Sequence, residues 1–201
     1  MPNWCMNEFV VSGRQDRVDR FLKAFKGKPP MFEAQESELK DGLLKEMHEE
    51  FVRTVREKGN MYCFNALVPV PKKILKQGFD MAGYSWCVDT WGSKWDVWGH
   101  VEIDSEELLE VDGVMYKKVR FSFDTAWGPP LEWLKVVAQI WFEVRLELLY
   151  WEPGMGFAGE MIWEGGVMER DDQISCEDSE VYVQFVKDKF GAEVFENMME
   201  D

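Results

Sequence analysis

Histidine and cysteine are scarce in this 201-residue sequence, which contains two histidines and four widely separated cysteines, Cys5, Cys63, Cys87 and Cys176. Because no CxxC pair occurs, neither a zinc site nor a small disulfide framework fits the spacing. The opening residues lack the basic and apolar regions of a signal peptide, and no apolar run approaches the length of a membrane span. These absences predict a reduced, cytoplasmic protein with no metal and no cofactor.

Basic charge is also scarce, but only in the second half of the chain. Residues 1–100 carry 15 Lys and Arg against 14 Asp and Glu, whereas residues 101–201 carry 8 against 24. So acidic a surface repels phosphates, which argues against nonspecific binding to nucleic acid or to an anionic membrane. Two interpretations stay open: the acidic residues provide solubility alone, or they form an acidic face that mimics a polyanion such as DNA.

What the sequence does contain is a large apolar and aromatic content, 46% and 14%, with ten tryptophans. A chain of this composition is not disordered, and its tryptophans must be buried or must contact a partner. We find no internal repeat, low-complexity tract or Ser/Gly-rich linker. We therefore predict a single domain over residues 1–201.

The first third of the chain predicts a strand and two helices. Trp4 to Val11 is dense in strand-forming residues, and the i, i+3, i+4, i+7 apolar spacing from Val18 to Phe25 predicts an amphipathic helix. A second apolar stripe predicts a helix over residues 36–57, which we interpret as part of an insertion at about 28–60. Residues 62–70 are expected to be a short strand or extended, and residues 75–83 a loop with one helical turn.

The central third predicts a hairpin. Residues 86–96 look like a tryptophan-rich loop, followed by a strand over 95–104, an acidic turn over 105–112 and a strand over 114–124. Asp112-Gly113 is the expected tight turn, and we expect the two strands to pair antiparallel.

The last third predicts a helix that starts at Gly128-Pro129-Pro130, since proline suits the first helical turn. Strands are expected at 145–151 and 157–164, and an amphipathic helix at 180–198. An acidic extension covers residues 169–201. The order of elements is a doubled split βαβ pattern, which predicts an α+β, ferredoxin-like antiparallel sheet with helices on one face and an added C-terminal strand and helix.

Four motifs in the same order resemble the YubB-like proteins of phages and conjugative plasmids, a family assigned a ferredoxin-like domain. The motifs are the opening MPNWCMN (1–7), WGSKWD (91–96), FDTAWGPP (123–130) and YWEPG (150–154). The resemblance spans residues 1 to about 165. It implies the same fold and an origin on a bacterial mobile element, and it transfers no catalytic residue.

Two patterns that could carry chemistry have simpler structural interpretations. The glycine spacing over residues 154–159 matches a dinucleotide fingerprint, but a strand follows it where the fingerprint needs a helix, so we predict a hairpin turn. Asp124, Glu152 and Glu160 could meet at one end of the sheet and hold Mg²⁺ or act in acid–base catalysis. Nothing in their spacing fixes them together, and Asp124 is better placed as a helix cap.

A cluster of tryptophans (Trp91, Trp95, Trp98 and Trp127) with Lys94 between them is the strongest candidate for a binding surface. Core packing explains some of these side chains; an exposed remainder would resemble an interface hot spot. Base stacking would require flanking basic residues, which the acidic second half lacks. The candidate partner-binding residues are Trp91, Lys94, Asp96, Trp98, His100 and Trp127.

The leading functional hypothesis is a non-enzymatic module that binds a protein. One alternative is an acidic mimic of nucleic acid that blocks a host restriction or CRISPR nuclease. Another is a small enzyme or nucleotide-binding protein. The sequence does not identify the partner or the oligomeric state.

Overall fold

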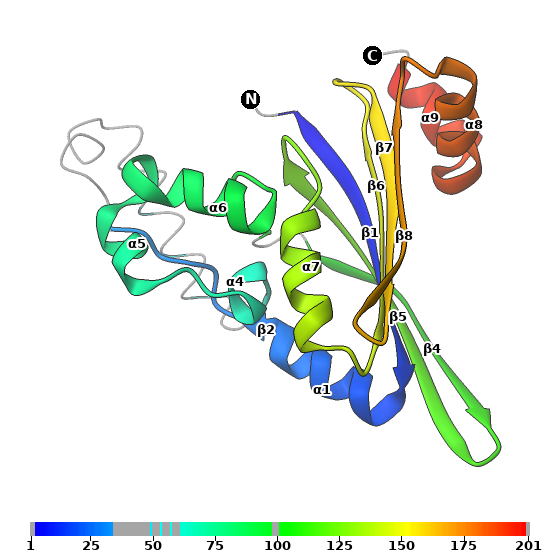
Figure 1. Cartoon of the computed structure of the whole chain (residues 1–201), viewed down its shortest axis with the longest axis horizontal. Coiled ribbons are helices and arrows are strands. Elements are labelled where there is room, and N and C mark those ends of the chain that lie inside the picture. The colour runs from blue at the N-terminus through cyan, green and yellow to red at the C-terminus, as the bar shows by residue number, and fades with distance from the viewer. Residues whose placement is uncertain are drawn as a thin grey trace.

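A computed structural model describes residues 3–33, 49, 53, 57, 61–97 and 101–199. Its centre is a six-stranded sheet in which every neighbouring pair of strands is antiparallel (Figure 1). The strands follow the order β4 (Glu102–Val111), β5 (Val114–Ala126), β1 (Trp4–Arg14), β6 (Arg145–Glu152), β7 (Phe157–Glu164) and β8 (Val167–Ser175).

Helices α1 (Gln15–Phe25) and α7 (Leu131–Ile140) cover one face of this sheet (Figure 1). Beside them residues 61–97 form a helical lobe, and near the C-terminus two further helices follow β8. The remaining elements are β2 (Lys26–Gly27), β3 (Met61–Tyr62), α4 (Phe64–Leu67), α5 (Lys72–Gln77), the π-helical turn η1 (Phe79–Gly83), α6 (Tyr84–Trp91), α8 (Ser179–Phe190) and α9 (Ala192–Met199).

The order β1-α1-β4-β5-α7-β6, with β1 between β5 and β6, is the split βαβ arrangement that the sequence predicts. The predicted fold class, an α+β ferredoxin-like antiparallel sheet, is therefore confirmed. The chain then extends the sheet by two strands, β7 and β8, where the sequence predicted one. Nothing in the residue pattern of β8 identified it, because its charged side chains do not alternate with apolar ones.

Phe9, in the middle of the central strand, joins the sheet to both covering helices. Its ring centroid lies 6.2 Å from that of Phe21 in α1, 6.1 Å from that of Phe121 in β5 and 5.6 Å from that of Trp133 in α7. Trp133 in turn lies 4.7 Å from Phe64 of the helical lobe. Large aromatic rings bury more area than any other side chains, so this cluster holds sheet, helices and lobe together.

Several predicted elements in the middle of the chain are wrong. Residues 86–96 were predicted as a loop, but α6 occupies most of them and ends at Gly92, whose φ of 81° and N–H bond to the Val88 carbonyl form a helix C-cap. The predicted strand over 95–104 begins only at Glu102, and the predicted acidic turn over 105–112 belongs to β4. The Asp112-Gly113 turn itself is confirmed, with φ of 51° and 76°.

The predicted helix over 36–57 lies almost entirely outside the described residues. Glu49, Arg53 and Glu57 are described, and each is helical and exposed. The predicted extended segment 62–70 contains only the end of β3, since α4 starts at Phe64.

Helices α8 and α9 pack on the sheet face opposite α1 and α7, at one end (Figure 1). The sequence predicted one helix here; Gly191, with a φ of 99°, divides it in two. Their contact with the sheet is a separate apolar cluster around Trp151, whose indole Nε1–H donates a 2.7 Å hydrogen bond to the Tyr182 hydroxyl.

All four cysteines are free thiols; Cys5, Cys63 and Cys87 are buried and Cys176 is exposed. Burial raises the pKa of Cys63 and of Cys87 to about 12 and that of Cys5 further still. In the part of the chain that the structure describes, no helix is both long and apolar enough to cross a bilayer.

Replacing Tyr182 with phenylalanine should destabilise the protein by about 1–3 kcal/mol, because the buried Trp151 N–H then has no acceptor. Urea unfolding monitored by tryptophan fluorescence measures the change. The matched control is Tyr116→Phe on an exposed side chain, which should stay within about 0.5 kcal/mol of the parent. Equal unfolding midpoints for the two variants would contradict this role of the Trp151–Tyr182 hydrogen bond.

Candidate protein-binding surface

Three segments far apart in the sequence meet where β1 begins and β5 ends. Trp4 pairs with Ala126 across the two strands, and the next residue, Trp127, donates its backbone N–H to the Asn3 carbonyl at 2.9 Å. The Lys94 N–H reaches the Ala126 carbonyl at 3.4 Å. The backbone therefore places the 91–97 segment beside the two tryptophans.

The side chains of these segments form a partly exposed group of rings. Trp4 is 46% exposed and Trp127 is 45% exposed, while Trp95 is half-buried with its ring centroid 6.3 Å from that of Trp4. The Lys94 ammonium lies 4.8 Å from the Trp95 ring and 5.9 Å from the Tyr84 ring, within cation–π range. We call these five residues the aromatic surface: Trp4, Tyr84, Lys94, Trp95 and Trp127.

Trp127 is held in a backbone conformation that tryptophan rarely adopts, with φ at 74°. Gly92, whose φ is 81°, closely approaches the segment that follows Trp127, because a Cβ there would lie 2.9 Å from the Pro129 carbonyl oxygen. Close backbone approach at Gly92 and the Gly128-Pro129-Pro130 corner leave the chain little freedom. Strained backbone of this kind costs about 1–3 kcal/mol and is concentrated at functional sites.

A pair of substitutions separates the backbone strain from the indole. Trp127→Gly and Trp127→Ala both remove the ring, but only glycine accepts a φ of 74° without strain. The glycine variant should therefore be the more stable by about 1 kcal/mol, the reverse of the usual order. Thermal and urea unfolding measure the difference, and an alanine variant as stable as the glycine variant would show that position 127 is unstrained.

Asp96 lies behind the aromatic surface and is only 3% exposed. Its carboxylate oxygens accept the backbone N–H groups of Phe64 at 2.6 Å and Asn65 at 2.9 Å. These are the first N–H groups of α4, whose own N-cap residue Cys63 makes no side-chain cap. Asp96 therefore caps α4 from 32 residues away. Desolvation outweighs these bonds and raises the pKa of Asp96 to about 7.

The raised pKa predicts how stability depends on pH. Between pH 3.8 and about 7 the folded state holds a proton on Asp96 that the unfolded chain releases. The stabilising contribution of Asp96 is therefore complete below pH 3.8 and is lost as the pH rises through 7, by at most about 1.4 kcal/mol per pH unit. Asp96→Asn keeps an acceptor and removes this dependence. The stability of wild type minus that of the variant should fall from pH 4 to pH 8 in urea titrations, whereas a constant difference would contradict the assignment.

Trp91 also belongs to the interior. It is fully buried, its indole N–H donates to the Val68 carbonyl at 3.0 Å, and its ring packs edge-on against Phe64 and Trp86. Burial leaves neither Trp91 nor Asp96 able to contact a partner, so both are corrections to the candidate list. Core packing, one of the two explanations that the sequence left open, accounts for Trp91.

The remaining candidates have different outcomes. Lys94 and Trp127 lie on the aromatic surface, while Trp98 and His100 lie outside the described residues. The sequence missed two members, Trp4 and Tyr84. Trp4 occupies an even-numbered position in β1, whereas the buried Cys5 and Phe9 occupy odd-numbered positions. This alternation could have predicted that Trp4 points away from the core. Tyr84 had none, because α6 was predicted as a loop.

The three carboxylates considered for catalysis do not meet. Asp124 in β5 and Glu160 in β7 are separated by β1 and β6, three strand spacings or roughly 14 Å. Glu152 accepts the N–H groups of Gly154 and Met155 in the β6–β7 turn, so the predicted hairpin at 154–159 is confirmed. The N-cap residue of α7 is Pro130, and Asp124 lies six residues earlier within β5, so Asp124 is not the N-cap residue of that helix. Within the described residues no group of three or more potential ligands could hold a metal ion.

The open face of the sheet, opposite α1 and α7, carries paired charges. Arg120 pairs with Glu8, and Arg145 pairs with Glu147 at 2.9 Å. Burial alone would raise the pKa of Glu160, but Lys189 at 2.8 Å and Arg170 at 2.7 Å outweigh it and lower that pKa. These arginines are neutralised by carboxylates, so the face does not offer the basic surroundings that stacked nucleic-acid bases require.

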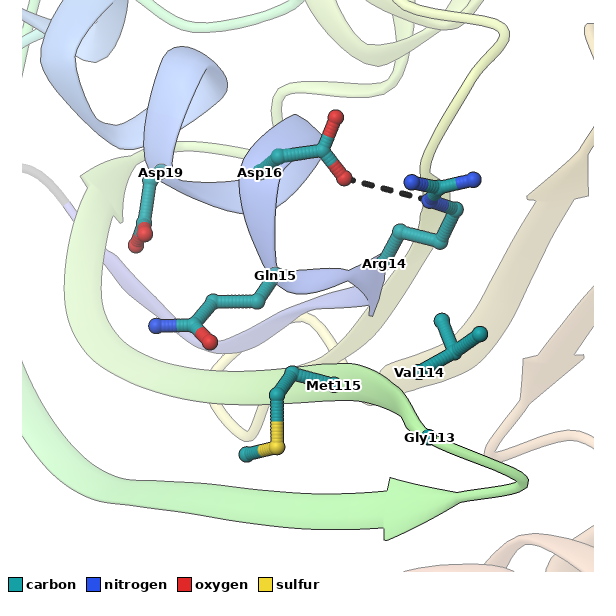
Figure 2. Close-up of a pocket in the computed structure, with 7 residues that line it drawn as sticks. All are labelled: Arg14, Gln15, Asp16, Asp19, Gly113, Val114 and Met115. Atoms are coloured by element: carbon teal, nitrogen blue, oxygen red, sulfur yellow. Dashed lines mark hydrogen bonds and ion pairs between the residues drawn. The ribbon is translucent and has the colours of Figure 1, made fainter.

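A hollow of about 500 Å³ lies at the opposite end of β1, between the first turn of α1 and the tip of the β4–β5 hairpin (Figure 2). Asp16 pairs with Arg14 at 3.2 Å, as the dashed line in Figure 2 shows, and Asp19 pairs with Lys117 at 2.9 Å. Its charged groups are thus neutralised locally, and its lining brings together no nucleophile with a base. The lining residues are Arg14, Gln15, Asp16, Asp19, Gly113, Val114 and Met115.

Comparison with known proteins supports the fold. Residues 100–192 match a family model described as the ferredoxin-like domain in Api92-like protein. The crystal structure of protein Api92 from Yersinia pseudotuberculosis resembles this chain with a TM-score of 0.53 and 10% sequence identity, covering 87% of this chain and 99% of that one. At that identity the likeness shows the fold alone. No curated protein matches the chain, and the YubB-like resemblance and mobile-element origin stay predictions.

Proposed function

We propose that the protein is a non-catalytic module that binds a partner protein through the aromatic surface. The observation that carries the proposal is the pair Trp4 and Trp127, each exposing nearly half of its side chain at the same end of the sheet. Tryptophan is the residue most enriched at interface hot spots, where its large ring enters a pocket of the partner. An indole left exposed in the free protein gains the most from such burial.

The rigidity of the surface also favours binding. The backbone of Trp127 is held by its hydrogen bond to Asn3 and by the close approach of Gly92 to Pro129, and the Lys94 ammonium makes a cation–π contact with Trp95. A preorganised surface loses less conformational entropy when a partner docks. The buried Trp91 and Asp96 anchor the 91–97 segment from beneath.

Two features support a role without catalysis. Asp124, Glu152 and Glu160, the carboxylates best placed by sequence for acid–base chemistry, lie apart in the sheet. The three buried cysteines have raised pKa values, so they stay protonated and are poor nucleophiles.

Because four motifs resemble the YubB-like proteins, the proposal also covers where the protein acts and which genetic element carries it. The protein acts in the bacterial cytoplasm, is carried by a phage or plasmid, and binds a protein of its host. A host defence nuclease is one such partner.

The acidic-mimic alternative rests on the net charge of −15. A mimic of DNA needs its acids along one path, as phosphates are. The acidic strands β4 and β8 instead form opposite edges of the sheet, five strand spacings or roughly 24 Å apart. Arg120 and Arg145 lie on the face between them. Protein binding through the aromatic surface is therefore the better-supported function.

Affinity capture from bacterial lysate with quantitative mass spectrometry tests the proposal. Partners captured by the wild type should be depleted roughly thirtyfold with Trp127→Gly or Trp4→Ala, the loss expected when a hot spot worth about 2 kcal/mol is removed. The matched control is Phe142→Ala, an exposed aromatic residue beside Gly166 at the other end of the sheet. Retention of the same partners by both tryptophan variants would rule out the aromatic surface as the binding site.

A further inference from the structure

Strand β4 is an edge of the sheet. Among the described strands it pairs only with β5, so the backbone N–H and C=O groups on its other side have no strand partner. Figure 1 shows the β4–β5 hairpin extending away from the body of the sheet, beyond the end of β1. A free edge of this kind is a template for another strand.

The usual protections of an edge strand are weak here. Proteins blunt such edges with lysine, proline, bulges or very short strands. Strand β4 has ten residues, contains neither lysine nor proline, and is bulged only between Ile103 and Ser105. Residues 105–111 pair with β5 in unbroken register, which leaves seven regular residues for an added strand. The other edge, β8, contacts α8 and carries Arg170.

The side chains of this edge are both apolar and acidic. Leu109 is 63% exposed, and Leu108, Val111 and Tyr116 are exposed beside it on the two faces of the hairpin. From residue 101 to residue 116 there are six Asp and Glu and no Lys or Arg. Exposed apolar side chains on an edge strand are a liability unless a partner covers them.

One lysine links the hairpin to α1. The Lys117 ammonium bonds to Glu106 of β4 at 2.7 Å and to Asp19 of α1 at 2.9 Å. Glu106 and Asp19 thus engage Lys117, and Glu107 lies opposite Lys118 across the two strands. Glu107 and Glu110 form no ion pair with the described residues, so both carboxylates are available to a basic residue of an incoming chain.

We propose that β4 binds an extended, Lys- or Arg-containing segment of a partner protein, which adds to the sheet as an antiparallel or parallel strand. The backbone edge supplies the hydrogen bonds, the exposed leucines and Val111 supply apolar contact, and the acids select for basic residues. A second copy of this chain fits poorly, because β4 paired with itself brings two rows of glutamates together. This site lies at the opposite end of β1 from the aromatic surface, so it is independent of the function proposed above.

The probe is an acetylated, amidated ten-residue peptide of alternating lysine and valine. Binding is measured by fluorescence anisotropy, and its location by hydrogen–deuterium exchange on the full chain. The peptide should bind and slow the exchange of backbone amides within residues 105–111. The same peptide N-methylated at alternate residues keeps its charge but cannot pair as a strand, so it should bind about tenfold more weakly or worse.

Charge-reversal variants distinguish peptide binding at the β4 edge from nonspecific attraction to the acidic protein. Glu107→Lys combined with Glu110→Lys should weaken peptide binding about tenfold or more, and Glu193→Lys in α9, an exposed acid elsewhere, should leave it nearly unchanged. Equal binding of the N-methylated peptide, protection outside β4, or equal loss in the Glu193 variant would each overturn the proposal. A concentration-dependent dimer in sedimentation, with β4 amides protected in the absence of peptide, would also overturn it, in favour of a second copy as the occupant.

Discussion

The structure depends on burying one face of its central strand. β1 is paired on both sides, and Phe9 in its middle contacts aromatic rings from α1, α7 and β5. Exposing a row of such side chains to water would cost a large amount of hydrophobic free energy, so this face must be covered. The two helices of the split βαβ plan satisfy that need, and Phe64 extends the same cluster into the helical lobe. The positions of both exposed surfaces follow from this interior.

The two surfaces differ in physical character because they lie at opposite ends of β1. At its start, three segments converge and present rigid rings, with Lys94 as the cation among them. At its end, the β4–β5 hairpin continues past the last residue of β1 and presents backbone, acids and aliphatic side chains. One end is thus suited to contact by side chains that enter pockets. The other is suited to main-chain hydrogen bonding, so the two proposed sites do not overlap.

How far the sequence predicts this architecture depends on the range of the interactions that form each element. The strands at 4–14 and 114–126 and the helices at 15–25 and 131–140 have local signals: alternation, helical periodicity and a tight Asp112-Gly113 turn. The lobe was mispredicted because α4 is capped by Asp96, a residue 32 positions away. Strand β4 was misplaced because its leucines are exposed on both faces, so no alternation marks it.

The sequence predicted only part of the candidate site, again because some of its features depend on residues far apart in the chain. Tryptophan content and the Lys94 spacing drew attention to the correct stretch, and Trp127 is indeed exposed. Trp91 is buried because it belongs to α6, a helix that the sequence did not predict. Trp127 has a positive φ, which tryptophan rarely adopts and which the sequence therefore did not predict. Burial of Asp96 likewise follows from the docking of α4 and not from its neighbours in the chain.

The burial of the thiols decides which cysteine a thiol reagent modifies. Three of the four cysteines are enclosed by the core, and their raised pKa values keep them out of the reactive thiolate form. Cys176, beside Gly156 at the end of β8, is exposed. A thiol reagent therefore reaches Cys176, at the end of β8, before the three thiols that the core encloses.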